Sequence, residues 1–348
     1  MNKKVAIIIL VYNGRQFLPD CLSSLTKITY PKDQYQIIVV DNASTDDSVN
    51  YIVKNYQNVK LIKNSENYGF AQGNNIGIQY AIDKGYDYIY LLNQDTVVDP
   101  NFLDQVVKLA ENSPKTAIIQ SKLLYYNDKT IINSRGNVIH FLGFGWADGN
   151  LEEDNACDVK EINYASGACM LIKITILKEI GLLDKDLFCY HEDLELCWRA
   201  KIFGYKIMLA AKSVVFHKYE FSRSITKYYY MERNRYMVML QYYKWPTLFL
   251  IGPAMDIMEI GLFLFSIKSG WWKEKIKVYK YLLNGKNLEK IFLKRRKIQS
   301  MRRVGDREMV RHFAGKIEHQ EIKNPIIDYL VNPFFNFYWQ IIKRIIWW

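Results

Sequence analysis

Apolar runs and amphipathic segments alternate along the first 120 residues. Four continuous apolar runs have the length of buried strands, and they span residues 5–11, 36–40, 59–62 and 86–92. The segments between them have helical spacing and cover residues 17–25, 46–56 and 74–84, and a further helix is predicted at 102–111. The alternation predicts an α/β fold with a mostly parallel central sheet flanked by helices.

A polar segment follows each predicted strand. These segments begin at Tyr12, Asp41, Asn64 and Asn93. In an open parallel sheet, ligands bind beyond the carboxyl ends of the strands. We therefore expect the four segments to converge on one cleft.

Asp41 and a glycine-containing run are the first candidates for ligand contacts. Asp41 suits a hydrogen bond to a ribose or a base, and it equally suits a helix cap or a turn. The run Asn67–Asn75 contains Gly69 and Gly73, where backbone can approach a ligand. It is neither a GxGxxG fingerprint nor a phosphate loop, which counts against dinucleotide dehydrogenases and P-loop enzymes.

Carboxylates and a histidine at element ends are candidates for chemistry. Asp95 follows the fourth strand, where a carboxylate can hold Mg²⁺ or Mn²⁺ against a diphosphate leaving group. His217 ends an apolar run and is either structural or a second metal ligand. Glu192 and Asp193 open a predicted helix at 190–205. They either stabilise its N-terminus or supply a base for an attacking hydroxyl.

Composition and charge limit the classes of protein to which the chain can belong. The chain of 348 residues is 49% hydrophobic and 24% charged, as in folded proteins. Five cysteines without a CxxC pair indicate a reducing compartment rather than a zinc or disulfide framework. Residues 1–150 carry 14 basic and 14 acidic side chains, whereas residues 151–348 carry 33 and 22, which accounts for the net charge of +11. Residues 268–311 hold 15 basic against 4 acidic side chains, which suits an anionic membrane surface, nucleic acid or solvated helix faces.

One C-terminal segment is largely apolar. Residues 247–267 contain Asp256 and Glu259, which are costly at the centre of a bilayer. Flanking tryptophans and basic residues suit a segment that lies at the membrane interface, and a helical subdomain packed on the core is the alternative. We predict a catalytic domain at 1–240 and a helical, membrane-associating extension at 241–348.

In order and spacing, these motifs resemble family 2 glycosyltransferases over residues 4–240. The resemblance lies in Val40–Asp46, Asn67–Ala71 with Asn74 and Asn75, Leu91–Asp95, and Glu192–Asp193 with Cys197–Arg199. Within that family the chain is most similar to rhamnosyltransferase-type enzymes that build bacterial surface polysaccharides. The usual D-x-D metal motif is here Asn93–Gln94–Asp95, which keeps the second carboxylate.

The resemblance implies a GT-A fold, which is Rossmann-like, and inversion at the anomeric carbon. It also implies a nucleotide-diphospho-sugar donor and Mg²⁺ or Mn²⁺ as cofactor. On this resemblance Asp193, with Glu192 beside it, is the catalytic base, and Asp95 and His217 hold the metal. The residues that it implies for donor binding are Tyr12, Asn13, Asp41, Asn67, Asn74, Asn93 and Arg233.

We therefore expect a glycosyltransferase of polysaccharide biosynthesis that moves L-rhamnose to a hydroxyl of a lipid-linked or growing surface glycan. It would work at the cytoplasmic face of the cell membrane, as a peripheral or monotopic protein. One alternative is a non-catalytic protein whose basic C-terminal half docks on anionic membrane or nucleic acid. No nucleic-acid-binding motif accompanies the charge, so we expect no nucleic acid partner. Another is a sugar-phosphate nucleotidyltransferase, which needs a glycine-rich basic loop where this chain has Tyr12–Arg15.

Overall fold

A computed structural model describes residues 3–155, 157–219, 225–318 and 327–348. The chain forms two compact units. Unit 1 contains Met1–Asn137, Ala147–Ala200 and Tyr205–Glu220, and unit 2 contains Val138–Trp146, Lys201–Gly204 and Phe221–Trp348. The expected domain boundary at residue 240 stays a prediction, and by packing the residues from 221 onward group with unit 2.

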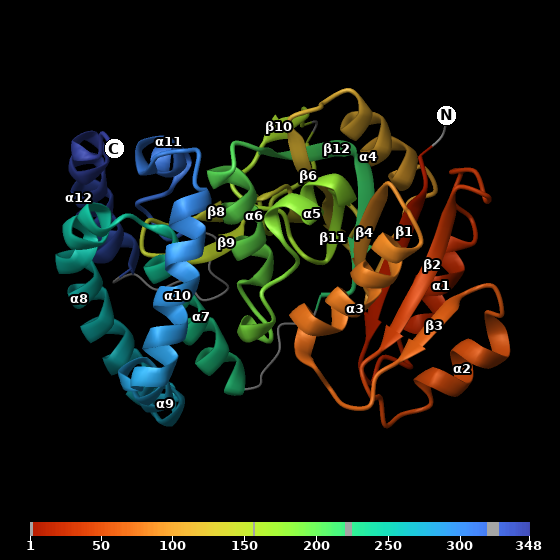
Figure 1. Cartoon of the computed structure of the whole chain (residues 1–348), viewed down its shortest axis with the longest axis horizontal. Coiled ribbons are helices and arrows are strands. Elements are labelled where there is room, and N and C mark those ends of the chain that lie inside the picture. Colours follow the sequence, from red (N-terminus) through yellow and green to blue (C-terminus); the bar gives the residue numbers. More distant parts are fainter. Residues whose placement is uncertain (1–2, 156, 220–224, 319–326) are drawn as a thin grey trace. The chain divides into compact units, whose positions relative to one another are not determined.

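Unit 1 is built on one mixed sheet with the order β10-β12-β6-β11-β4-β1-β2-β3 (Figure 1). Two short strands lie off this path, with β5 paired to β12 and β7 paired to β6. The strands are β1 (Val5–Val11), β2 (Tyr35–Asp41), β3 (Lys60–Lys63), β4 (Tyr88–Asn93), β5 (Thr96–Val98), β6 (Thr116–Tyr125), β7 (Ile132–Ser134), β10 (Lys160–Glu161), β11 (Cys169–Lys173) and β12 (Lys206–His217).

Parallel pairing at the centre of the sheet sets the position of the strand ends. β1 pairs in parallel with both β2 and β4, and β2 pairs in parallel with β3. In this register Val11 lies opposite Asp41, and Leu10 lies opposite Asn93. The predicted α/β class and its mostly parallel central sheet are confirmed. The polar segments after these strands leave the sheet at the same edge, as expected.

Helices cover the sheet of unit 1. They are α1 (Leu18–Leu25), α2 (Ser48–Asn55), α3 (Gly69–Asp83), α4 (Phe102–Glu111), α5 (Ile174–Ile180), a 3-10 turn (Lys185–Leu187) and α6 (Glu192–Ile202), whose last two residues group with unit 2. α3 packs on β1 and β2, and α4 packs on β6 and β12. Apolar side chains of α1 and α4 join the strands in one buried core.

Helix α3 begins five residues earlier than the pattern predicted, at Gly69 rather than at residue 74. Two of its glycines pack against the sheet. A Cβ at Gly73 would lie 2.6 Å from Leu10 Cδ1, and one at Gly77 would lie 2.7 Å from Ile8 Cγ2. Gly73 therefore allows close helix–sheet packing, and a ligand contact by its backbone stays a prediction.

Unit 2 is mainly helical. It contains α7 (Thr226–Tyr242), α8 (Trp245–Lys268), α9 (Trp272–Leu283), α10 (Gly285–Met301), α11 (Asp306–Met309), a 3-10 turn (Val310–His312), a π-helical turn (Ile327–Val331) and α12 (Asn332–Ile345). The ladder of β8 (Asn137–Ile139) and β9 (Gly145–Ala147) carries the chain from unit 1 into unit 2 and back.

A quartet of charged side chains, three of them buried, joins three helices of unit 2. On α7, Arg235 donates two hydrogen bonds of 3.0 Å to Glu232, and Lys275 of α9 donates one of 2.6 Å to the same carboxylate. Lys275 also lies 2.6 Å from the half-buried Glu259 of α8. Burial opposes ionisation, but Arg235 and Lys275 lower the pKa of Glu232 to about 2. Glu232 is therefore ionised at pH 7 although it is buried.

Candidate active site

Asp41 lies at the end of β2 in a tight polar loop. Its side chain is 3% exposed, and its Oδ2 accepts a 3.3 Å hydrogen bond from the backbone N–H of Ser44. The Ser44 hydroxyl in turn accepts from the Asn13 N–H at 3.0 Å, and the Asn13 side chain accepts from the Thr45 N–H at 2.8 Å. The segments after β1 and β2 are thus joined, and Asp41 Oδ1 keeps no hydrogen-bond partner within the described residues.

Asn42 joins the ends of β2 and β3 to the start of α3. Its Nδ2 donates to Asn67 Oδ1 at 2.8 Å, and its Oδ1 accepts from Asn64 Nδ2 at 3.0 Å. Asn67 Oδ1 also accepts from the Gly69 N–H at 2.9 Å. The amide oxygen of Asn67, a predicted donor-binding residue, therefore supports the loop itself.

The Asn93–Gln94–Asp95 motif lies at the end of β4, and the side chains of Gln94 and Asp95 have different partners. The Gln94 side chain accepts from the Tyr12 N–H at 3.1 Å and donates to the Tyr12 carbonyl at 3.3 Å, so it clamps the segment after β1. Asp95 Oδ2 lies 3.4 Å from His217 Nε2 at the end of β12. The other nitrogen of His217 lies 2.9 Å from Asn133 Oδ1. The two predicted metal ligands are therefore brought together, and Asn133 orients the ring.

Asp95 and His217 fit a divalent cation that a substrate helps to hold. Asp95 Oδ1 is buried and has no hydrogen-bond partner among the described residues. No cluster of three histidine, cysteine or acidic residues suitable for a metal occurs in the described ranges. Two protein ligands suffice for Mg²⁺ or Mn²⁺ when phosphate oxygens and water complete the coordination shell.

Asp193 is tied to the same edge of the sheet through the loop before β11. Its Oδ2 accepts a 3.0 Å hydrogen bond from the Gly167 N–H, and its Oδ1 accepts a 2.7 Å bond from the Leu194 N–H. The carbonyl of Ala168, next to Gly167, accepts from the Asn93 N–H at 3.0 Å. A short chain of hydrogen bonds thus links Asp193 to the end of β4, two residues before Asp95.

The adjacent carboxyls of Glu192 and Asp193 have different surroundings. Burial raises the pKa of both, and the charge of Asp193 raises that of Glu192 further, well above its ordinary value. Glu192 Oε2 is buried without a hydrogen-bond partner in the described ranges, whereas two backbone N–H groups favour the ionised form of Asp193. These hydrogen bonds favour the charged form of Asp193, which is the form that can accept a proton, whereas Glu192 Oε2 lacks such support in the described ranges.

Gly69 brings the loop before α6 against the start of α3. It has φ +76, and a Cβ there would lie 2.6 Å from the Phe188 carbonyl oxygen and 2.5 Å from the Phe188 ring. The same carbonyl accepts a 3.1 Å hydrogen bond from the Ala71 N–H. Phe188, Tyr190 and His191 all have φ between 63 and 68. Left-handed backbone at three non-glycine residues is costly, and such strain concentrates at functional sites.

The remaining predicted donor residues differ in placement. Asn74 donates to the Phe70 carbonyl at 3.0 Å, within its own helix, and is 2% exposed. Arg233 lies on α7 in unit 2 and donates to Asn234 Oδ1 at 2.9 and 2.7 Å. Tyr12 lies at the strand-end edge with 44% of its surface exposed. Donor contacts by these three residues stay predictions.

Sequence reasoning missed three residues that build the site. The pattern presents Gln94 only as the middle of a metal motif, and its clamp on Tyr12 depends on the pairing of β1 with β4. Gly167 and Asn133 lie between the predicted helices at 102–111 and 190–205, where the pattern predicts no element. Each contacts a partner at least 26 residues away in sequence. A glycine just before an apolar run is the one local signal for Gly167.

The geometry of unit 1 agrees with comparisons to known proteins. The family model for glycosyl transferase family 2 matches residues 6–181, about half of the chain. The chain therefore belongs to glycosyl transferase family 2, and the predicted family and GT-A fold are confirmed.

Curated relatives are distant, and the match covers only part of each. The low-salt glycan biosynthesis hexosyltransferase Agl10 of Haloferax volcanii is 24% identical over 205 residues, which cover 58% of this chain and 62% of that protein. The poly-beta-1,6-N-acetyl-D-glucosamine synthase of Staphylococcus epidermidis is 25% identical over 205 residues, covering 58% of this chain and 47% of that one. The chain thus spans less than two thirds of the length of these relatives.

Solved structures share the fold. The crystal structure of GalNAc-T7 with UDP, GalNAc and Mn²⁺ aligns with a TM-score of 0.57 at 18% identity, covering 70% of this chain and 48% of that one. The crystal structure of S. aureus TarS aligns with a TM-score of 0.50 at 16% identity, covering 68% of this chain and 39% of that one.

The Gly69 contact generates a stability prediction. Replacing Gly69 with Ala strains the left-handed backbone by about 1–2 kcal/mol and adds a clash with Phe188 of roughly 1–3 kcal/mol. Gly85→Ala is the matched control, because Gly85 has φ +73 and a Cβ added there would have nothing within 4 Å. Denaturant unfolding should show a larger loss for Gly69→Ala. Equal losses would mean that the Phe188 contact contributes nothing.

Proposed function

We propose that the protein is an inverting glycosyltransferase that moves a sugar from a nucleotide-diphospho-sugar to an acceptor hydroxyl. The observation that carries the proposal is the meeting of three acidic groups at one edge of the sheet in unit 1. Asp41 ends β2 with an unpartnered oxygen in the described part, the Asp95–His217 pair follows β4, and Asp193 is tied to that edge through Gly167. Family membership supports the same class of reaction.

The proposed roles follow from the chemistry of each group. Asp41 accepts hydrogen bonds from the nucleoside, as a carboxylate at this position of a parallel sheet does in other nucleotide-binding folds. Asp95 and His217 would hold Mg²⁺ or Mn²⁺, which when bound neutralises charge on the departing diphosphate. No covalent nucleophile is needed, since inversion takes a single in-line displacement.

Asp193 takes the proton in this proposal. The acceptor oxygen forms a bond to the anomeric carbon while the bond from that carbon to the diphosphate oxygen breaks, and the hydroxyl proton passes to the Asp193 carboxylate. Backbone N–H groups of Gly167 and Leu194 hold that carboxylate in place. Because burial raises the pKa of Asp193, it is a stronger base than an exposed aspartate.

Asp193→Asn should lower kcat by about 10²–10⁴-fold, the usual contribution of a general base, while donor affinity stays nearly unchanged. Asn retains an oxygen that can accept from the Gly167 N–H, so the loop should keep its structure. Initial rates with a soluble acceptor and donor titration by calorimetry are the measurements. Glu192→Gln is the matched variant, with a smaller expected loss. The base assignment fails if Glu192→Gln abolishes transfer and Asp193→Asn does not.

The donor is proposed to carry L-rhamnose, and the acceptor to be a lipid-linked or growing surface glycan. The rhamnosyltransferase-like motif pattern supports the sugar. The relatives named for glycan and polysaccharide synthesis support the acceptor class. The reducing compartment and the amphiphilic C-terminal helices support work at the cytoplasmic face of the cell membrane.

Thermal unfolding with a panel of dTDP-, UDP- and GDP-sugars tests donor and metal together. A bound donor at a hundred times its Kd adds about 2.7 kcal/mol to the stability of the folded state. We expect donors of one nucleotide class to stabilise the protein, with dTDP-rhamnose among them. This stabilisation should disappear when a chelator is added and in the variant Asp95→Ala. Asp33→Ala is the control, since Asp33 is an exposed carboxylate before β2, at the opposite edge. Stabilisation that survives chelation would contradict the metal role.

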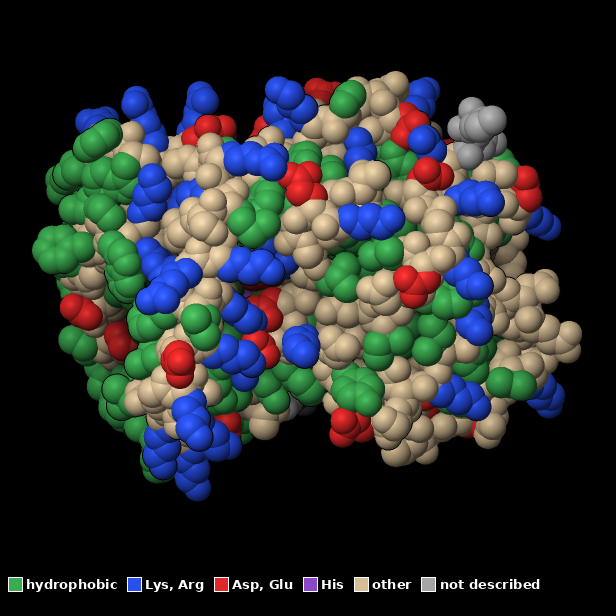
Figure 2. Space-filling model, viewed as in Figure 1, with side chains coloured by type: hydrophobic (Ala, Val, Ile, Leu, Met, Phe, Trp, Pro, Cys, Tyr) green, Lys and Arg blue, Asp and Glu red, His purple; other side chains and the backbone are tan. Residues whose placement is uncertain are grey.

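A peripheral position on the membrane is supported by the exposed surface of α8 and α12. α8 is long and apolar enough to cross a membrane, by length and composition alone. Its Glu259, however, is paired with Lys275, and the exposed Asp256 lies near its middle. Exposed apolar side chains gather over α8 and α12 (Figure 2), and they include Phe249, Ile260, Leu264, Phe334, Phe337, Ile341 and Ile345. We propose that this apolar face lies in the membrane interface.

Loss of the apolar face should release the protein from vesicles. Phe249 is 83% exposed and Phe337 is 69% exposed, and burial of each should strengthen membrane binding roughly tenfold. The double variant Phe249→Ser/Phe337→Ser should therefore lose vesicle binding in flotation assays. Leu283→Ser is the control, because Leu283 is 82% exposed but lies at the end of α9. Full binding by the double variant would refute the proposed face.

A further inference from the structure

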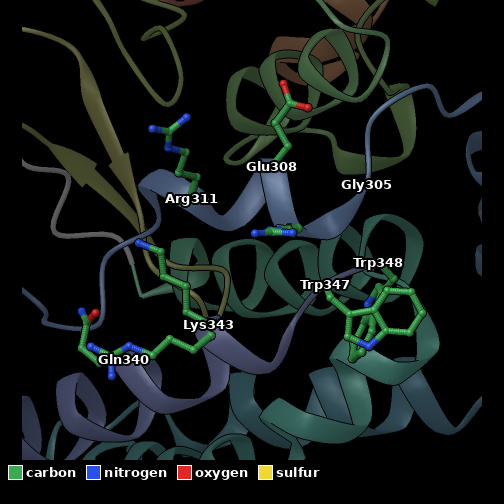
Figure 3. Close-up of a pocket in the computed structure, with 9 residues that line it drawn as sticks. Gly305, Glu308, Arg311, Gln340, Lys343, Trp347 and Trp348 are labelled. Carbon is green, nitrogen blue, oxygen red and sulfur yellow. The ribbon is translucent and has the colours of Figure 1, made fainter.

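A basic pocket lies in unit 2 beside the C-terminal helix. It has a volume of about 750 Å³ and is lined by Gly305, Arg307, Glu308, Arg311, Gln340, Lys343, Arg344, Trp347 and Trp348. Figure 3 shows Arg311 and Lys343 on one side of it and the Trp347 indole on the other. Four basic side chains thus face one acidic side chain, so the pocket is suited to an anion.

The basic side chains of the pocket are not neutralised by the protein. No ion pair to Arg307, Arg311, Lys343 or Arg344 occurs within the described residues. Burial lowers the pKa of Lys343, and the charge of Arg311 lowers it further. The four basic side chains outnumber the one acidic side chain of the pocket and repel one another, and an anion bound between them would relieve the repulsion.

The position of the pocket on α12 relates it to the apolar face. Residues three and four apart share one side of a helix. One side of α12 is buried in unit 2, and it holds Phe335, Trp339 and Ile342, with Ile346 just past the end of the helix. A second side is exposed and apolar, with Phe334, Phe337, Ile341 and Ile345. The third side holds the pocket residues Gln340, Lys343 and Arg344, and the pocket residue Trp347 follows just past the end of the helix.

This arrangement predicts the level at which the pocket would lie in a membrane. If the exposed apolar side of α12 enters the acyl boundary, the neighbouring side lies at the level of the lipid headgroups. Trp347 is 75% exposed, and tryptophan indoles favour that same level. The Trp348 indole donates a 2.9 Å hydrogen bond to Thr247 of α8, which ties the pocket wall to the second helix of the apolar face.

We propose that the pocket binds the phosphate group of an anionic phospholipid while the apolar face of α8 and α12 lies in the membrane interface. Arginine and lysine side chains match a phosphate in charge and in hydrogen-bond geometry. The proposal rests on the membrane position proposed above and is independent of the transfer chemistry in unit 1. It assigns recognition of a lipid headgroup to a defined pocket rather than to the diffuse positive charge of residues 268–311.

Flotation with two kinds of vesicle tests this assignment. Vesicles of phosphatidylcholine alone are compared with vesicles that contain 30% phosphatidylglycerol. Arg311→Gln/Lys343→Gln should lose more than about tenfold in affinity for the anionic vesicles, since each basic residue near the surface contributes roughly fivefold. The control Arg296→Gln/Lys297→Gln removes the same charge from the exposed surface of α10 and should lose clearly less. The charge-preserving variant Arg311→Lys/Lys343→Arg should retain binding, which shows that the pocket still folds.

The other outcomes overturn the proposal in distinguishable ways. Equal losses in the two double variants would mean diffuse attraction without a pocket. Stabilisation by millimolar inorganic phosphate that depends on Arg311 and Lys343, with unchanged vesicle binding, would mean a site for a soluble anion. Transfer to a soluble acceptor should be unchanged in the pocket variants, so a failure of the catalytic proposal would be seen separately. Loss of binding to both kinds of vesicle is expected only of the apolar-face variant.

Discussion

The parallel pairing of β1 with β2 and β4 is the constraint on which the candidate active site depends. Because the three strands run in register, Val11, Asp41 and Asn93 come to the same edge of the sheet. Each following segment is short and polar. The side chains of Gln94 and Ser44 accept hydrogen bonds from the segment after β1, and Asn42 donates one to Asn67, so that these segments are joined to one another. A shift of one strand would separate Asp41, the proposed nucleotide contact, from Asp95, the proposed metal ligand.

Packing outside the sheet brings Asp193, the proposed catalytic base, to that edge. Asp193 belongs to a helix more than 90 residues beyond β4, and backbone groups of the loop before β11 position it. The loop before α6 contains left-handed residues, and it can lie close to α3 because Gly69 has no side chain. Both adjacent carboxyls are buried, but their hydrogen bonds differ. Asp193 accepts two from backbone N–H groups, and Glu192 Oε2 accepts none within the described ranges.

Local pattern was sufficient for much of unit 1. The predicted bounds of β1 and α4 agree with the structure, and the predicted convergence of the strand ends is confirmed. The strands β6 and β11 were not predicted, since their pairing with distant strands determines them. The same reason explains Asn133 and Gly167, whose roles arise from tertiary contacts. Gly73 shows the limit of local pattern, because its packing against Leu10 of β1 is seen only in the tertiary structure.

The charged quartet of unit 2 has a consequence for how its helices assemble. Apolar helix surfaces tolerate several alignments, because a slide of one turn exchanges one aliphatic contact for another. Glu232, Arg235, Glu259 and Lys275 tolerate one, since any slide leaves a buried charge without its counter-charge. We infer that these ion pairs fix the register in which α7, α8 and α9 pack against one another. It also retains α8 within the fold, because a bilayer that extracted this helix would leave Lys275 and Arg235 facing Glu232 alone.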